Sequence, residues 1–173
     1  MKVNGLTVMN TVYIGLGSNL SNPAKQIRTA VEALANLKNC QIDKISALYF
    51  SRPMGPKDQP DYMNAVLSLT TNLSAIKLLD ALQNIENIAG RVRKDNRWGA
   101  RVLDLDILLF GNQVIKTERL TIPHYGMKTR EFVLIPLHEL VCDLVLPDGE
   151  KLAELIQNID QNGLKIFDYS LQL

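Results

Sequence analysis

The amino-acid sequence predicts an α+β protein, a ferredoxin-like β-α-β-β-α-β sandwich with helical additions towards the C-terminus. Four segments with strand patterning and two with helical spacing follow one another in that order. No repeat, low-complexity tract or linker interrupts them. The 173 residues are therefore expected to form one domain over 1–173, in which 1–7 is a short extension without an assigned role.

The first strand is expected over 8–17 and ends in a Gly-Ser-Asn turn. Asn22 followed by Pro23 is typical of a helix start, because asparagine caps free amide groups and proline fits the first helical position. Apolar residues then keep helical spacing to about Lys38. A strand over 41–50 and a loop over 51–61, rich in Pro, Gly and polar residues, come next.

Residues 62–71 alternate between apolar and polar side chains, which predicts a strand with one buried face. Val66 is the apolar exception on the polar face. Ser74 is a favourable N-cap for a second helix that ends near Gly90. The buried side of that helix is expected to hold Ile76, Leu79, Leu82 and Ile85.

An arginine-rich loop over 91–101 leads into a fourth strand over 102–110, after which a short hairpin partner is expected. Two shorter helices are expected over 130–140 and 151–159. The two long helices should cover one face of a four-stranded antiparallel sheet. The other face is then free for additions or for a ligand.

Composition narrows the possible functions. The net charge of +1 argues against binding nucleic acid through bulk charge, and 46% hydrophobic residues can form a sizeable core. No apolar run is long enough to span a bilayer, and the N-terminus does not read as a signal peptide. Cys40 and Cys142 are expected to be free, buried or partly buried thiols. We therefore expect a cytoplasmic monomer without a membrane or nucleic-acid partner.

Asp104 and Asp106 lie on the same face of the strand VLDLDILLF, about 7 Å apart. The opposite face, made of Leu103, Leu105, Ile107 and Leu109, should pack against the helices. Two neighbouring carboxylates repel each other, and a cation in front of them removes that cost. Magnesium favours one or two carboxylates together with water and phosphate oxygens. A solvated surface with Asp–Arg pairs is the alternative for this pattern alone.

The segment RVRKDNRWGAR places five cations just before the aspartates, together with one aromatic side chain, Trp98. Guanidinium groups bind phosphate oxygens through paired hydrogen bonds, so the segment is interpreted as a polyphosphate clamp. Trp98 is suited to stacking on a ring. An ordinary solvated loop is the other interpretation of the segment alone. The cations of the clamp are Arg91, Arg93, Lys94, Arg97 and Arg101.

Other polar residues have both a structural and a functional interpretation. Tyr62 and Asn64 share the aspartates' face if both strands belong to one sheet, and an amide suits the edge of a flat heterocycle. Gln83 and Glu86 lie on one helix face, which by itself predicts a solvated stripe. His124 suits either a turn or an anion contact, and His138 a structural role in a helix; two such histidines do not form a zinc site.

The residues give weaker support to two alternative functions. A nucleotidyltransferase would have its acidic pair soon after the Gly-Ser turn, whereas here about 85 residues intervene. An RNA-binding module of this topology would need stacking aromatics on YMNAVLSLT, which lacks them, and acids on the open face would repel RNA. P-loop and dinucleotide-binding fingerprints are absent or incomplete.

Four separated segments make residues 12–160 resemble the 6-hydroxymethyl-7,8-dihydropterin pyrophosphokinase family. The most specific is GRVRKDNRWGARVLDLDILLFG at 90–111. GLGSNL, GPKDQPDYMN and TERLTIPHYGMKTREFVL support it. The resemblance implies a ferredoxin-like core and transfer of the pyrophosphoryl group of ATP to the pterin hydroxymethyl oxygen, with release of AMP, in folate biosynthesis.

The resemblance also implies roles for individual residues. Asp104 and Asp106 would hold two Mg²⁺ ions on ATP, and Arg91 and Arg101 would stabilise charge on the transferred group. The implied ATP-binding residues are Gln83, Glu86, Arg93, Ile107, Arg119, Thr121, His124, Tyr125 and Arg130. The implied pterin-binding residues are Ser51, Pro53, Met54, Tyr62, Asn64, Trp98 and Phe132.

One departure lies in the loop before Tyr62. Ser51-Arg52-Pro53 stands where family members often have Thr-Pro-Pro, so the resemblance leaves the exact contacts of this loop open. The extension over 1–7 is a second departure, and neither touches the metal or phosphate residues.

Overall fold

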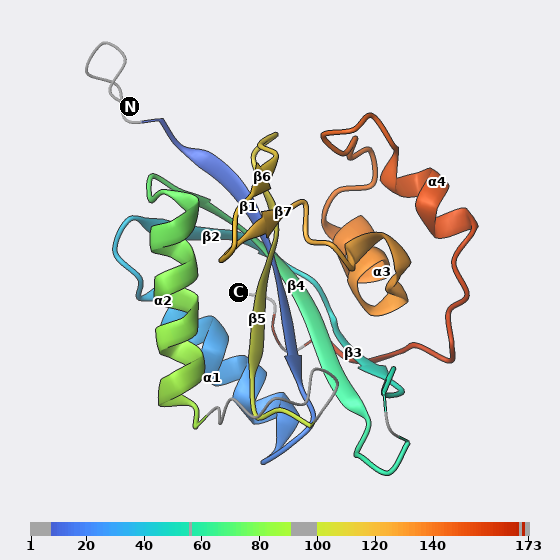
Figure 1. Ribbon diagram of the computed structural model, residues 1–173. Helices are drawn as coiled ribbons and strands as arrows, with labels where there is room; N and C mark the ends of the chain where they lie inside the picture. The colour runs from blue at the N-terminus through green and yellow to red at the C-terminus, as the bar shows by residue number, and fades with distance from the viewer. Residues whose placement is uncertain (1–7, 56, 91–99, 170, 172–173) are drawn as a thin grey trace.

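The computed structural model describes residues 8–55, 57–90, 100–169 and 171. Its main sheet has six strands in the order β5-β1-β4-β3-β8, with β2 also paired to β4. Helices α1 and α2 cover one face, and α3 and α4 lie on the opposite side (Figure 1). The bounds are β1 Asn10–Ser18, α1 Pro23–Ala35, β2 Cys40–Ile45, β3 Leu48–Ser51, β4 Tyr62–Thr71, α2 Ala75–Ile88, β5 Asp104–Phe110, β6 Ile115–Lys116, β7 Thr121–Ile122, a 3₁₀ turn Met127–Thr129, α3 Glu131–Leu140, α4 Leu152–Gln157 and β8 Lys165–Asp168.

The ferredoxin-like prediction is confirmed, since β5, β1, β4 and the β2–β3 segment pair antiparallel in the expected order. Both predicted helix caps are also present. The Asn22 side chain accepts a hydrogen bond from the Lys25 amide, and Ser74 accepts one from the Lys77 amide. These caps satisfy backbone donors that have no partner inside the helix.

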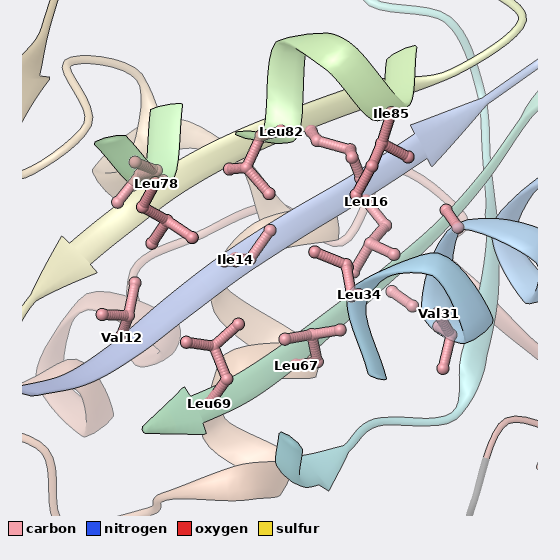
Figure 2. Packing of buried hydrophobic residues seen from close by; sticks show 14 of the residues in the cluster. Val12, Ile14, Leu16, Val31, Leu34, Leu67, Leu69, Leu78, Leu82 and Ile85 are labelled. Carbon is pink, nitrogen blue, oxygen red and sulfur yellow. The ribbon is translucent and has the colours of Figure 1, made fainter. Parts of the chain in front are cut away.

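The main core lies between the sheet and helices α1 and α2. In Figure 2, Ile14 and Leu16 of β1 lie under Leu82 and Ile85 of α2. Leu78 and Leu82 are fully buried, whereas Ile76 and Leu79 are only partly buried. The buried face of α2 therefore differs by a small rotation from the predicted one.

A second core explains the apolar exception in β4. Val66 has no exposed surface and belongs to a cluster with Leu134 and Leu137 of α3 and Leu152 of α4. Helices α3 and α4 therefore cover part of the face that the sequence left free. None of the helices in the described ranges has both the length and the apolar character that a bilayer crossing requires.

The predicted strand over 41–50 is two strands, β2 and β3, because the extended segment is interrupted at Ser46 and Ala47. Ser46 is fully buried, and its hydroxyl accepts a hydrogen bond from the Val66 amide at 3.0 Å. The Ala47 amide donates to Glu139 of α3 at 3.0 Å. Side chains thus satisfy backbone groups that the ladder leaves unpaired at the break.

Leu109 does not face the helices as predicted. Tyr13 pairs with Leu109 and Ile14 with Ile107, so Leu108 is an extra residue in β5. Such a bulge reverses the alternation of side chains beyond it. Leu108 and Leu109 consequently lie in the second core and Phe110 in the main one.

Three smaller expectations need correction. The short hairpin is β6 with β7, rather than a partner of the preceding strand. Strand β8 was not foreseen, and it pairs with β3 at the edge of the sheet. Both cysteines are free, but Cys142 is exposed while Cys40 is partly buried.

Replacing Ser46 with Ala should leave the buried Val66 amide without an acceptor, at a cost of about 1–3 kcal/mol. The melting temperature should then fall by about 2–4 °C for each kcal/mol lost. Ser68→Ala is the matched control, because Ser68 is a buried serine on β4 whose hydroxyl has no hydrogen bond to the described residues. Equal melting temperatures for the two variants would contradict this role of Ser46.

Candidate active site

Asp104 and Asp106 lie on the same face of edge strand β5, as predicted. They pair across the sheet with Gly17 and Gly15 of β1. Because glycine has no side chain, the sheet surface beside the two carboxylates is low and open. Two pockets meet at this point, and both aspartates line both of them.

The two aspartates differ in how their charge is balanced. Arg101 Nη1 lies 2.6 Å from Asp104 Oδ2, and both side chains are mostly buried. Burial alone would lower the pKa of Arg101, but the charge and hydrogen bond of Asp104 raise it overall. Arg101 therefore remains a cation fixed beside Asp104.

Asp106 carries the less balanced charge. Removal from water, followed by the nearby charge of Asp104, raises the pKa of Asp106 to about 7, although Arg130 acts in the opposite direction. Its side chain is still 38% exposed, so solvent screens part of this effect. The paired carboxylates favour a bound cation, which would relieve their repulsion.

The donor set fits magnesium better than a metal that needs a protein cage. The described residues contain no group of three or more His, Cys, Asp or Glu side chains placed as metal ligands. Two carboxylates leave positions for water and for phosphate oxygens, which is the usual magnesium environment in phosphate-transferring enzymes.

The turn after β1 positions the start of β5. Asn19 Oδ1 accepts a hydrogen bond from the Arg101 amide at 2.7 Å, and its Nδ2 donates to the Pro60 carbonyl at 2.9 Å. Ser18 Oγ donates to the Val102 carbonyl at 2.6 Å. The turn thus joins two loops from distant parts of the sequence at one corner of the site.

The Leu108 bulge positions His124. The carbonyl of Leu108 accepts the His124 amide at 2.9 Å, which places the imidazole Nε2 at 3.6 Å from Asp106 Oδ2. His124 Nδ1 accepts from the Gly126 amide at 3.2 Å, so the proton of the neutral ring is on Nε2. Burial, followed by the charge of Arg130, lowers the pKa of His124 to about 4, and the ring is neutral near pH 7.

The first pocket, called the α2 pocket, opens between α2, β5 and the β6–β7 connection. Arg119 lines it and forms an exposed ion pair with Asp80 of α2 at 2.6 Å. Most of the residues predicted to bind ATP gather here. They are Gln83, Glu86, Ile107, Arg119, Thr121, His124 and Tyr125.

Glu86 is not part of a solvated stripe, as helix spacing alone suggested. It is almost fully buried, and its Oε1 accepts the Leu105 amide at 2.8 Å. This bond satisfies a donor on the outer edge of β5, with which no other strand of the described residues pairs. Gln83 is half-buried and lines the α2 pocket.

The second pocket, called the sheet pocket, lies over β1 and β4, and the loop after β3 forms part of its wall. Asn64 Nδ2 donates to Ser51 Oγ at 2.7 Å, and both residues are buried. Burial raises the pKa of Tyr62, against the effect of Arg101. The Arg130 guanidinium lies 5.6 Å from the Tyr125 ring centroid and 6.0 Å from that of Phe132.

The residues predicted to bind the pterin are mostly in this pocket. Ser51, Met54, Tyr62, Asn64 and Phe132 line it, and so does Arg130, which was expected at ATP. Pro53 does not line it, whereas its neighbour Arg52 does. Arg91, Arg93 and Trp98 lie outside the described residues.

Sequence reasoning missed several residues that shape the sheet pocket. Gly15 and Gly17 were noted only as part of a turn and an incomplete fingerprint, yet they form the floor. Their position opposite two aspartates could be found only from the strand register. Gln59 also lines the pocket, where its Oε1 accepts from Asn19 Nδ2 at 3.1 Å.

A comparison with family models matches residues 13–142 to 7,8-dihydro-6-hydroxymethylpterin-pyrophosphokinase (HPPK). The chain belongs to this family. Among curated relatives, the 2-amino-4-hydroxy-6-hydroxymethyldihydropteridine pyrophosphokinase of Haemophilus influenzae is 55% identical over 91% of the chain and 99% of the relative. The enzyme of that name from Pseudomonas aeruginosa is 50% identical over 91% of the chain and 97% of the relative.

Solved structures support the fold of this HPPK-family chain. The wild-type HPPK-DHPS of Plasmodium falciparum, solved with pteroate, superposes with a TM-score of 0.70 at 14% identity, over 90% of the chain. The chain spans 43% of that longer protein. At this identity, the similarity concerns the fold alone.

Replacing Asp106 with Asn should stabilise the ligand-free protein near neutral pH. The pKa of the Asp106 carboxyl is higher in the folded protein than in the unfolded chain, where it is about 4. The resulting contribution to stability is therefore complete below about pH 4 and is lost as the pH rises through about 7. Allowing for solvent screening, the expected gain is on the order of 1 kcal/mol, or about 2–4 °C in melting temperature. The difference between variant and parent should grow between about pH 4 and pH 7 and then level off. A constant difference would contradict the raised pKa.

Proposed function

We infer that the chain transfers the pyrophosphoryl group of ATP to the hydroxymethyl oxygen of 6-hydroxymethyl-7,8-dihydropterin, in folate biosynthesis. The observation that carries this inference is the junction of the two pockets. Arg101, Asp104 and Asp106 line both the α2 pocket and the sheet pocket. A group that passes between two substrates would pass in front of these side chains.

We propose that ATP occupies the α2 pocket and the pterin occupies the sheet pocket. The α2 pocket offers Arg119 and His124 to phosphates, and Gln83 to the nucleoside. The sheet pocket offers a low glycine floor and an amide, Asn64, which suit a flat heterocycle with hydrogen-bonding edges. Arg91, Arg93 and Trp98 keep their predicted roles in this proposal.

Asp104 and Asp106 would hold two Mg²⁺ ions at the junction, as the family resemblance implies. Bound there, Mg²⁺ would offset the negative charge of the phosphates and act as a Lewis acid. The raised pKa of Asp106 supports this assignment, because the carboxylate lacks a full counter-charge of its own. Arg101, paired with Asp104, would keep that side chain oriented.

In the proposed reaction, the hydroxymethyl oxygen bonds to the β-phosphorus of ATP. The bond from that phosphorus to the oxygen that bridges to the α-phosphorus breaks, AMP leaves, and the hydroxymethyl proton passes to solvent. Arg101 and Arg130 would stabilise the charge that moves on to AMP, because fixed cations need no rearrangement during the reaction. The walls of the two pockets would bring the two reacting atoms together.

We also propose that the protein is cytoplasmic and acts as a monomer with a single domain. Light scattering after size exclusion should give the mass of one chain, 19.4 kDa. A dimer mass would contradict the monomer.

Incubation with ATP, Mg²⁺ and 6-hydroxymethyl-7,8-dihydropterin should yield AMP and the pterin diphosphate in equal amounts. Chromatography of the nucleotides with phosphorus NMR of the pterin product measures both. ADP as the nucleotide product would instead indicate transfer of a single phosphoryl group, and absence of turnover would overturn the proposal.

Replacing Asp104 or Asp106 with Ala should lower kcat by about 10²–10³-fold, since charge stabilisation at the transferred group is lost. Asp43→Ala is a matched control, because Asp43 is an exposed strand carboxylate that contacts Thr70 and lines neither pocket. Steady-state rates at saturating substrates provide the comparison. Turnover of both site variants within a few-fold of the control would contradict the metal role.

A further inference from the structure

Arg52 is a cation in the wall of the sheet pocket without an assigned role. It follows Ser51, the last residue of β3, and its side chain is exposed at the pocket. Among the described residues it has no hydrogen bond or ion pair. Five arginines are described, and the other four each have a polar or ring contact. Arg52 therefore has donors available for a ligand.

The C-terminal segment passes beside this side chain. Gly163 lies beside the guanidinium, so that a Cβ atom there would be 3.9 Å from Nε, Cζ and Nη2 of Arg52. The next element, β8, pairs with β3 and reaches Phe50, two residues before Arg52. Both Gly163 and β8 lie beyond residue 142, where the family match ends. The segment that lies beside Arg52 is therefore outside the region matched by the family model.

The strand order places Arg52 at the end of the pocket away from the aspartates. Asp104 pairs with Gly17, Gly17 pairs with Asn64, and Asn64 pairs with Tyr49 of β3. Three strand spacings, about 14 Å in total, separate β5 from β3. If the hydroxymethyl group faces Asp104, the fused rings extend across β1 and β4. The ring that carries the amino and oxo groups then lies towards β3.

Hydrogen-bond accounting indicates which group meets Arg52. Asn64 uses its Nδ2 on Ser51, and its Oδ1 lies 3.4 Å from the position of a Cβ atom on Gly17, at the floor. Asn64 therefore offers an acceptor, which suits the N–H groups of the ring. Gln59, in the loop before β4, accepts at its Oε1 from Asn19 Nδ2 and Tyr62 Oη. The ring oxo group needs a donor, and guanidinium carries only donors.

We propose that Arg52, from its place in the wall of the sheet pocket beside Gly163, determines specificity for the pterin by donating a hydrogen bond to the ring oxo group. The inference rests on the proposed function, because it needs the pterin in the sheet pocket. It assigns Arg52 to ground-state recognition of one substrate. ATP binding and the rate of group transfer should not depend on it.

The test compares how the parent and Arg52→Ala bind two ligands that differ at ring position C4. Exchange of the oxo group for an amino group also turns N3 from a donor into an acceptor, and the comparison between the two proteins cancels that second change. 6-Hydroxymethylpterin carries the oxo group, and 2,4-diamino-6-hydroxymethylpteridine carries an amino donor in its place. Calorimetry near pH 7, where both rings are mostly neutral, gives both affinities in the presence of Mg²⁺ and a non-hydrolysable ATP analogue. The parent protein should prefer the oxo ligand, and Arg52→Ala should reduce that preference by about tenfold.

Two further variants separate recognition from folding. Arg52→Lys keeps a charged donor and should retain part of the preference, whereas Lys57→Ala, an exposed cation in the same loop outside the pocket, should retain all of it. In turnover assays, Arg52→Ala should raise KM for the dihydropterin by about tenfold with kcat and KM for ATP unchanged.

The outcomes distinguish the inference from the function on which it rests. An unchanged oxo preference in Arg52→Ala, with normal turnover in the parent, would overturn the role of Arg52 alone. The same holds if kcat falls while KM for the pterin stays constant. Failure of the parent protein to bind either ligand would instead contradict the proposed function.

Discussion

Two like-charged carboxylates on the same face of β5 set the constraint on which the site depends. Asp104 is neutralised by Arg101, whereas the pKa of Asp106 is raised by its surroundings and by Asp104. Folding alone would favour an uncharged residue at such a position. The arrangement becomes favourable once a cation and phosphate oxygens share the space. Under the proposed function, the aspartates would lower the stability of the empty protein and favour binding of a charged substrate.

Hydrogen bonds to backbone groups from segments distant in the sequence fix the position of β5 and of the residues around the two aspartates. Glu86 satisfies the outer edge of β5 between the two aspartates, and Asn19 joins the start of β5 to the loop that precedes β4. The bulge at Leu108 provides the carbonyl that places His124 beside Asp106. Each contact fixes a backbone position, so the functional side chains project from fixed points. Pre-organisation of this kind reduces what must be ordered when substrates bind.

The helices and most strands could be predicted from residues close together in the sequence. The site depends on contacts between residues that are far apart in the sequence. The caps at Asn22 and Ser74 act within one turn, and these predictions are confirmed. Strand β4 forms where its pattern predicts, but α3 packs on its second face, so both faces are largely buried. The bulge at Leu108 depends on pairing with β1, and no feature of β5 alone announces it. Helix spacing alone places Glu86 on a solvated stripe. Its carboxylate binds the Leu105 amide, 19 positions further along the chain, and the helix sequence gives no sign of that partner. Arg52 rather than Pro53 lines the pocket, and its guanidinium lies beside Gly163, which is distant in the sequence.

The central claim is that the two aspartates bind metal together with ATP. Calorimetry with α,β-methylene-ATP, whose P–C–P link cannot be cleaved in the proposed reaction, measures this without turnover. The account predicts that Mg²⁺ strengthens binding of the analogue to the parent protein by at least about tenfold, and that Asp104→Asn and Asp106→Asn each lose most of this gain. An equal gain from Mg²⁺ in the parent and in both variants would contradict it.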